Sequence, residues 1–124
     1  MSEPSPEIIK QLKDKFQDRS LHQVEKYDPK DENTKYVFLM TGPTRDELDK
    51  FDAEMLKASE VKDTADRKNA IRSAVERAAY ALIRWPDRDE CKRVFGLHSD
   101  MVFTFAEDIR NFAGASFETR SKKL

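Results

Sequence analysis

The stretch KYVFLMTGPTRDELDKF, from Lys35 to Phe51, joins an apolar run directly to a charged helical pattern. Its first part, Tyr36 to Met40, favours a strand because aromatic and β-branched side chains fit a pleated surface. The apolar residues follow one another without alternation, which indicates that both faces of the strand are covered. Gly42-Pro43 then ends the strand, since proline has no N–H for the ladder, and Thr44 to Glu47 has the pattern of a capping box. The sequence therefore predicts a strand, a sharp turn and a helix in immediate succession.

The residues before this stretch predict a helix and a second strand. Ser5 is a suitable N-cap and Pro6 a suitable first helical residue, so an amphipathic helix is expected from about Pro6 to Phe16. Leu21 to Tyr27 is compatible with a strand, and Asp28 to Thr34 has the composition of a turn or loop. The two strands are expected to pair as an antiparallel hairpin. Such a hairpin is marginally stable alone in water, so helices are expected to pack on it.

The residues after Phe51 have helical patterns throughout. Residues 59–68 are highly charged and predict either an exposed extension of the preceding helix or a linker. An Ala-rich helix with Ile71 on its apolar face follows, and it is expected to end at Arg84-Trp85-Pro86. Its alanines favour a helix and allow the close approach of a neighbouring element.

Two further helices complete the predicted domain. Asp87 is the expected N-cap of a short helix that Gly96 ends, and Ser99 opens a last helix that ends at Gly114. The predicted fold class is α+β, with a two-stranded antiparallel hairpin packed against a mostly helical domain of four to five helices. Residues 1–5 are expected to be a disordered N-terminus, residues 6–114 a single domain, and residues 115–124 a flexible tail.

The composition restricts the classes of function. Lys+Arg 23 against Asp+Glu 24 leaves the chain almost neutral, so nucleic acid, which selects a clustered basic surplus, is not an expected partner. No apolar run approaches the roughly 18 residues that a membrane span needs. The N-terminus is polar, without the apolar segment of a secretory signal. A soluble protein of the cytoplasm is expected.

The residues that most often carry chemistry have simpler structural interpretations here. His22 and His98 lie in different predicted elements, without a third ligand in register, so no metal site is predicted. Cys91 has no neighbouring histidine in the sequence and is expected to be a small buried hydrophobe. The acidic pairs that begin at Asp46 and Asp89 lie in first turns of helices, where carboxylates complement the helix dipole. No catalytic residue and no cofactor site is predicted, and the chain is not expected to be an enzyme.

Aromatic side chains are concentrated in the C-terminal third of the sequence. Phe105 and Phe112 fit the apolar face of the last helix, whereas Phe103 lies at its edge and Phe117 lies beyond it. Exposed aromatic groups mark association surfaces. Trp85, Phe103 and Phe117 are therefore the predicted partner-binding residues, with simple filling of the core as the alternative.

The order of these elements resembles a family of small proteins from long-tailed phages and prophages, the tail assembly chaperones. The resemblance covers most of the chain from Glu7 to Gly114. It is carried by YVFLMTGPTRDELDKF, an aromatic-rich strand that runs into Pro-Thr-Arg and an acidic–apolar helix, and by Trp85-Pro86-Asp87 before a short helix. Its motifs are short, and the family has no catalytic residues to compare.

The resemblance implies a non-enzymatic protein that acts in the host cytoplasm during assembly of the virion tail. Proteins of this kind bind the long, helical tape-measure protein and keep it soluble until tail-tube subunits polymerise around it. The implied partner is thus a tape-measure or tail-tube protein, bound through apolar grooves that accept amphipathic helices. Homo-oligomerisation is left open. The alternative is a prophage-encoded regulator or inhibitor that binds a host protein or nucleic acid.

Overall fold

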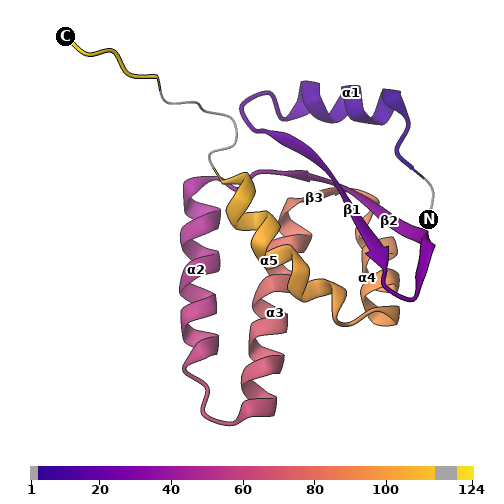
Figure 1. Cartoon of the computed structure of the whole chain (residues 1–124), viewed down its shortest axis with the longest axis vertical. Helices are drawn as coiled ribbons and strands as arrows, with labels where there is room; N and C mark the ends of the chain where they lie inside the picture. The colour runs from indigo at the N-terminus through magenta and orange to yellow at the C-terminus, as the bar shows by residue number, and fades with distance from the viewer. Residues whose placement is uncertain (1–2, 114–119) are drawn as a thin grey trace.

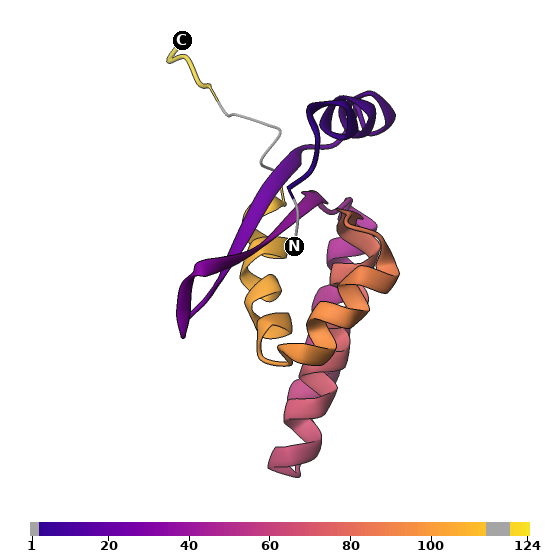
Figure 2. The same ribbon diagram turned by 90° about the vertical axis from the view of Figure 1, so that its right-hand side faces the viewer.

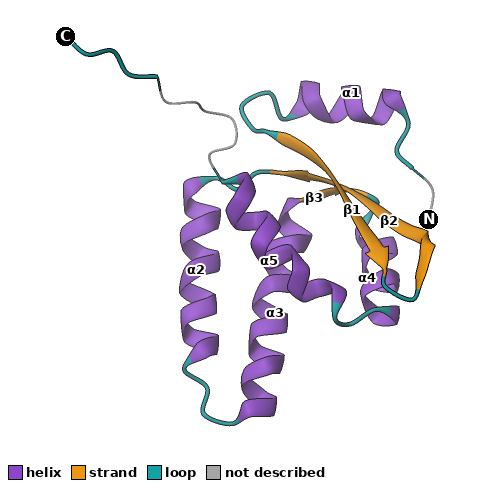
Figure 3. Cartoon of the chain, viewed as in Figure 1, coloured by secondary structure: helices purple, strands orange, loops and turns teal. Residues whose placement is uncertain are grey.

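A computed structural model describes residues 3–113 and 120–124 of the chain (Figure 1). This described part contains five helices and a three-stranded antiparallel sheet, so the predicted α+β class is confirmed (Figure 3). The elements in chain order are α1 (Pro6–Lys15), β1 (Leu21–Asp28), β2 (Asp31–Thr41), α2 (Arg45–Ser59), α3 (Thr64–Leu82), β3 (Ile83–Trp85), α4 (Arg88–Leu97) and α5 (Met101–Phe112). None of these helices is long and apolar enough to cross a bilayer.

The central strand β2 is covered on both faces, as its unbroken apolar run predicts. Phe38 and Met40 are fully buried in the main core, on the side of the sheet where α2 to α5 lie (Figure 2). Val37, Leu39 and Thr41 alternate with them and are also buried, and α1 lies across the sheet on that side (Figure 1). The sheet is therefore a middle layer between one helix and four.

The main core is built around aromatic rings from three elements. Phe38 of β2 meets Phe105 of α5 edge to face, with ring centroids 5.2 Å apart. Phe95 of α4 lies 5.5 Å from Phe105 and 6.0 Å from Phe38. Buried aromatic pairs with these geometries stabilise a core beyond the area that they bury. Phe105 thus has the core position that its helical spacing predicts.

The Ala-rich helix ends earlier than predicted, and a third strand follows it. The helix α3 stops at Leu82, and Ile83–Trp85 is a strand that pairs with β2, with Trp85 opposite Leu39. The prediction that the helix continues to Arg84-Trp85-Pro86 is wrong because a residue before proline disfavours the helical conformation. The free edge of β2 offers these residues ladder hydrogen bonds instead.

Two loop predictions also need correction. The hairpin turn is only Pro29 and Lys30, because β2 already begins at Asp31, not after Thr34. The Asp28 carboxylate accepts a hydrogen bond from the Lys30 N–H at 2.8 Å, which stabilises this tight turn. Residues 60–63 are a linker, and α3 resumes the helical structure at Thr64.

The predicted ends of the last two helices are shifted. Gly96 lies inside α4, which ends one residue later with His98 as its C-cap, so the assignment of Gly96 as the cap is wrong. The last helix begins at Met101 instead of Ser99 and ends at Phe112. Gly114, the predicted end, lies outside the described residues, as do residues 115–119 of the predicted tail 115–124.

The junction between β2 and α2 forms as predicted. The Thr44 hydroxyl accepts a hydrogen bond from the Glu47 N–H at 3.2 Å, and the Glu47 carboxylate accepts one from the Thr44 N–H at 2.9 Å. Arg19, from the loop between α1 and β1, donates to the Gly42 carbonyl at 2.7 and 3.0 Å and also binds Glu47. The junction therefore joins the open end of the β1–β2 hairpin, where β1 begins and β2 ends, to the start of α2.

Gly42 is required at this junction because the backbone of α5 passes directly over it. A Cβ at position 42 would lie 2.6 Å from the Phe112 carbonyl oxygen and 2.7 Å from the Ser20 hydroxyl. Both distances are too short for a carbon atom, and the carbonyl belongs to the main chain. The end of α5 can approach the sheet this closely only if residue 42 has no side chain.

Gly42→Ala is expected to lower the free energy of unfolding by about 1–3 kcal/mol, because the core must shift to admit one methyl group. Gly96→Ala is the matched control, since a Cβ at Gly96 meets nothing within 4 Å. This control should raise stability by up to about 1 kcal/mol, because alanine is the better helix former. Urea denaturation followed by circular dichroism measures both. Equal effects of the two substitutions would contradict the close approach at Gly42.

Candidate functional site

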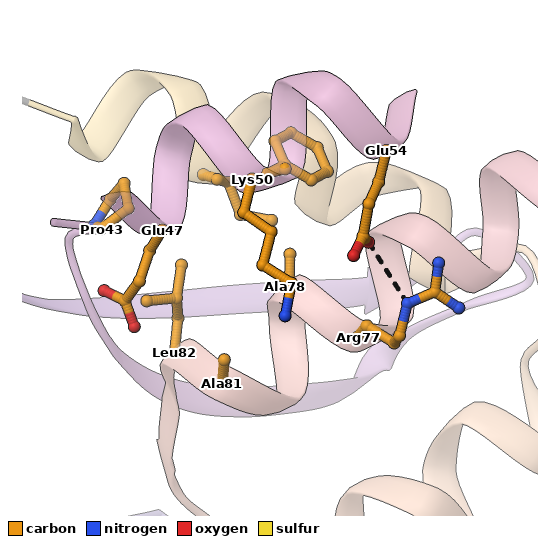
Figure 4. Close-up of a pocket in the computed structure, with 10 residues that line it drawn as sticks. Pro43, Glu47, Lys50, Glu54, Arg77, Ala78, Ala81 and Leu82 are labelled. Atoms are coloured by element: carbon orange, nitrogen blue, oxygen red, sulfur yellow. Dashed lines mark hydrogen bonds and ion pairs between the residues drawn. The ribbon is translucent and has the colours of Figure 1, made fainter. Parts of the chain in front are cut away.

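A groove between α2 and α3 is the best-formed concave surface of the described residues. Its hollow near the sheet has a volume of about 190 Å³. The apolar lining comes from α2, α3, α5 and the turn before α2, and consists of Pro43, Phe51, Ala78, Ala81, Leu82 and Ile109. The charged side chains Glu47, Lys50, Glu54 and Arg77 stand around it (Figure 4). An apolar floor with a charged rim suits an amphipathic ligand.

The groove continues towards the far end of the α2–α3 hairpin. A second hollow of about 410 Å³ is lined by residues that include Ala58, Val61 and Ala70. Glu54 and Arg77 line both hollows, and their side chains form an ion pair at 3.2 Å that crosses the groove between them (Figure 4). The Arg77 side chain is 60% exposed. Exposed ion pairs of this kind contribute roughly 0–1 kcal/mol, so a ligand can displace this one at small cost.

Small side chains on α3 keep the groove open. Ala74 and Ala79 are buried, whereas Ala78 and Ala81 face the groove. Ala81 is exposed, although it lies beside the buried Leu82. The alanines thus have two roles: those at the core allow α3 to pack closely, and those at the groove leave space that no other described residue fills.

Electrostatic contacts fix the end of the groove that lies nearest the sheet. Burial works against ionisation of Glu47, but the hydrogen bonds from Thr44 and the positive charge of Arg19 outweigh it and lower the pKa of Glu47. Glu47 is therefore an anion at neutral pH, held in place from two directions. Lys50, one turn along α2, has no ion-pair partner among the residues that the structure describes. The rim thus offers one free cation to a ligand.

The three predicted partner-binding aromatics do not form one surface with this groove. Trp85 is half-buried in β3, opposite Leu39 and therefore on the side of the sheet that α1 covers. Phe103 is half-buried on α5, with the guanidinium of Arg72 5.2 Å from its ring centroid. Phe117 lies outside the described residues. Neither Trp85 nor Phe103 lines the groove. Sequence reasoning missed the groove because its lining mixes charged, aliphatic and alanine side chains from several elements, with Phe51 as its one aromatic residue.

The residues with possible chemistry have structural partners. Cys91 is buried at the start of α4, and burial, together with the carboxylates of Asp87 and Glu90, raises the pKa of its thiol to about 12. His98 shares a 2.8 Å hydrogen bond with the Tyr36 hydroxyl. The His22 ring stacks on Phe112, with centroids 3.8 Å apart, and its burial lowers the pKa of that imidazole.

The acidic first turns act as caps. The Asp87 carboxylate accepts a hydrogen bond from the Glu90 N–H at 2.8 Å, as the sequence predicts. Across residues 3–113 and 120–124, no three His, Cys, Asp or Glu side chains gather in a way that would hold a metal ion. The groove between α2 and α3 therefore remains the strongest candidate, and what it offers is a binding surface.

Comparison of the chain with protein-family models, with the curated proteins and with the solved structures found no match. The groove and the sequence motifs are therefore the features of this chain that bear on its function.

The charge of Glu47 predicts a pH dependence of stability. Because its pKa in the folded protein lies below the ordinary 4.5, its contribution is present above that pH and is lost as the pH falls through the folded value. Glu47→Gln should lower the free energy of unfolding by about 1 kcal/mol at pH 7, since the partly exposed ion pair with Arg19 is lost. The difference from the wild type should shrink at pH 3. Urea titrations at both pH values measure it.

Glu54→Gln is the control, because among the described residues Glu54 pairs only with the exposed Arg77 across the groove. Its cost should stay below about 0.5 kcal/mol at either pH. If Glu47→Gln is equally mild, or if its cost is the same at pH 3 and pH 7, the Arg19–Glu47 contact does not hold the junction.

Proposed function

We propose that this chain is a non-enzymatic tail assembly chaperone-like protein that holds an amphipathic helix of a tape-measure client in the groove between α2 and α3. The observation that carries the proposal is the groove itself, with an apolar floor and a charged rim. The groove is elongated, because its two hollows follow one another between α2 and α3. This form suits a helical ligand more than a compact one. The proposal that the client is a tape-measure protein comes from the resemblance of the sequence motifs to those of tail assembly chaperones.

The client helix would lie with its apolar face on Phe51, Ala78 and Leu82. The small alanine side chains would let its backbone approach closely, and its flanking charges would meet the rim. Lys50, which has no ion-pair partner in the described part of the chain, would accept an acidic side chain of the client. The client would gain solubility because its apolar face is covered and the mixed charges of this chain face the host cytoplasm.

Gene context is a direct test of the tail-assembly part of the proposal. The gene for this chain should lie next to a tail-tube gene and a long tape-measure gene. If neither neighbour is present, the client is not a tape-measure protein, and the regulator or inhibitor of a host protein becomes the better interpretation.

Ala81→Glu is expected to weaken binding of the client at least about tenfold, which corresponds to about 1.4 kcal/mol, because a carboxylate would stand on the apolar floor of the groove. Ala81 is exposed, so the substitution should leave the fold intact. The measurement is the soluble yield of a co-expressed tape-measure fragment, followed by its affinity for the purified chain.

Ala53→Glu is the matched control, because Ala53 is an exposed alanine of α2 that does not line the groove. It should solubilise the client as well as the wild type does. Equal activity of the two variants, with both folded, would place the client elsewhere on the molecule.

A further inference from the structure

A second cleft lies between α3, α4 and the start of α5. It has a volume of about 310 Å³, with Phe95 and Val102 as apolar lining and Arg72, Lys92 and Ser99 as polar lining. The cleft uses a different side of α3 from the first groove. Arg72, Glu76 and Tyr80 recur every four residues and share one face of the helix, whereas Ala78 and Ala81 lie roughly opposite, at 100° per residue.

The cations in and beside this cleft have no carboxylate partner in the described part of the chain. Within the described residues, no carboxylate oxygen lies within 4 Å of a charged nitrogen of Lys68, Arg72 or Lys92. Arg72 donates to the Asn69 side chain at 3.1 Å, and its buried Nε has no hydrogen-bond partner in the same part of the chain. The lining of the cleft thus has two cations without an ion pair, Arg72 and Lys92, against the one carboxylate of Glu76.

The Phe103 ring holds two of these cations beside the cleft. The Arg72 guanidinium lies 5.2 Å and the Lys68 ammonium 5.9 Å from the ring centroid. Contacts of a cation with an aromatic face stabilise the cation without neutralising its charge. Phe103, one of the predicted partner-binding residues, thus contacts Lys68 and Arg72 beside the cleft without lining it.

The carboxylate that lines the cleft, Glu76, is already engaged. It accepts a hydrogen bond from the Tyr80 hydroxyl at 2.7 Å, and burial, together with that bond, raises the pKa of Tyr80 well above its usual range. The guanidinium of Arg88 lies over the Tyr80 ring, 4.9 Å from its centroid. Glu76 keeps its negative charge but is directed to Tyr80, and it forms no ion pair with Lys92 or Arg72 among the described residues.

We propose that this cleft binds an acidic segment of a protein partner, with a Glu or Asp side chain between Arg72 and Lys92 and an adjacent apolar side chain on Phe95 and Val102. Charge complementarity selects the carboxylate, and the apolar lining selects a peptide over a bare inorganic anion or a nucleic-acid backbone. The site is independent of the α2–α3 groove, so both can be occupied at once. An acidic–apolar helix bound here would contact α3 from the side opposite the first ligand.

Gly96 provides a means of closing the cleft without disturbing the core. It lines the cleft, and a Cβ built on it meets nothing within 4 Å. Gly96→Glu would place a tethered carboxylate one helical turn from Lys92, where it would compete with the carboxylate of the partner. Gly96→Gln has almost the same shape and no charge, so it separates competition by charge from simple obstruction.

The test is fluorescence anisotropy with a labelled 12-residue peptide of alternating Glu-Glu and Leu-Leu pairs, compared with the same peptide carrying Gln in place of Glu. The wild type should bind the acidic peptide at least tenfold more tightly than the Gln peptide. Lys92→Gln replaces an exposed side chain that forms no ion pair among the described residues. It should weaken binding of the acidic peptide about tenfold. Gly96→Glu should do the same, and Gly96→Gln should retain more of the binding.

The controls separate this site from the proposed chaperone function. Ala81→Glu should leave binding of the acidic peptide unchanged, and Lys92→Gln should leave binding of the client in the α2–α3 groove unchanged. Equal affinity for the Glu and Gln peptides, or no effect of Lys92→Gln, would overturn the proposal. Duplex DNA or inorganic phosphate that displaces the peptide at equal or lower concentration would overturn the assignment of a peptide ligand.

Discussion

Burial of β2 on both faces is the constraint on which the rest of the structure depends. Five consecutive residues from Val37 to Thr41 are between 0% and 2% exposed, so neither face of the strand can be left to water. At roughly 25 cal/mol per Å² of apolar area, covering such a strand is a major part of the stability of a chain of this size. One helix therefore has to cross one face of the sheet, and four have to pack on the other (Figure 2).

The way in which β2 ends determines where the candidate groove lies. Gly42 lets the end of α5 approach the strand, and Arg19 joins Gly42 and Glu47 across the junction, so the first turn of α2 is held firmly. The helix α3 runs back along α2 and leads into β3, which joins the sheet. The far end of the α2–α3 hairpin extends beyond the other elements (Figure 1). A groove lined by alanines between two such helices has no further element of the described chain to fill it.

Local signals in the sequence predicted the parts of the fold that local chemistry determines. The caps at Ser5, Thr44 and Asp87 form because each side chain bonds an N–H three residues away, which requires no knowledge of the rest of the molecule. The unbroken apolar run of β2 likewise predicted that both faces of the strand are buried. The strand β3 was missed because three residues carry no periodicity, and only the free edge of β2 makes them a strand. Gly96 was predicted to be a C-cap because the sequence alone does not distinguish a glycine that ends a helix from an exposed glycine inside one.

The candidate sites were harder to predict for a related reason. Aromatic residues signal association surfaces when they are exposed, but Trp85 and Phe103 are half-buried, and Phe103 is engaged by two cations of α3. The groove exists partly because Ala78 and Ala81 have small side chains that leave space between the helices. Small side chains form a groove only when a second helix lies beside them. The sheet and the turn between α2 and α3 determine where that helix lies. The sequence contains the alanines without indicating which of them face the core.

The central claim, that a client helix lies in the α2–α3 groove, is tested most directly by NMR of the chain labelled with ¹³C at its alanine methyl groups. The methyl signals of Ala78 and Ala81 should shift on addition of a tape-measure fragment, because both line the groove. Those of the exposed Ala53 and Ala65, outside the groove, should stay in place. A bound fragment that leaves the Ala78 and Ala81 signals unmoved would contradict the account.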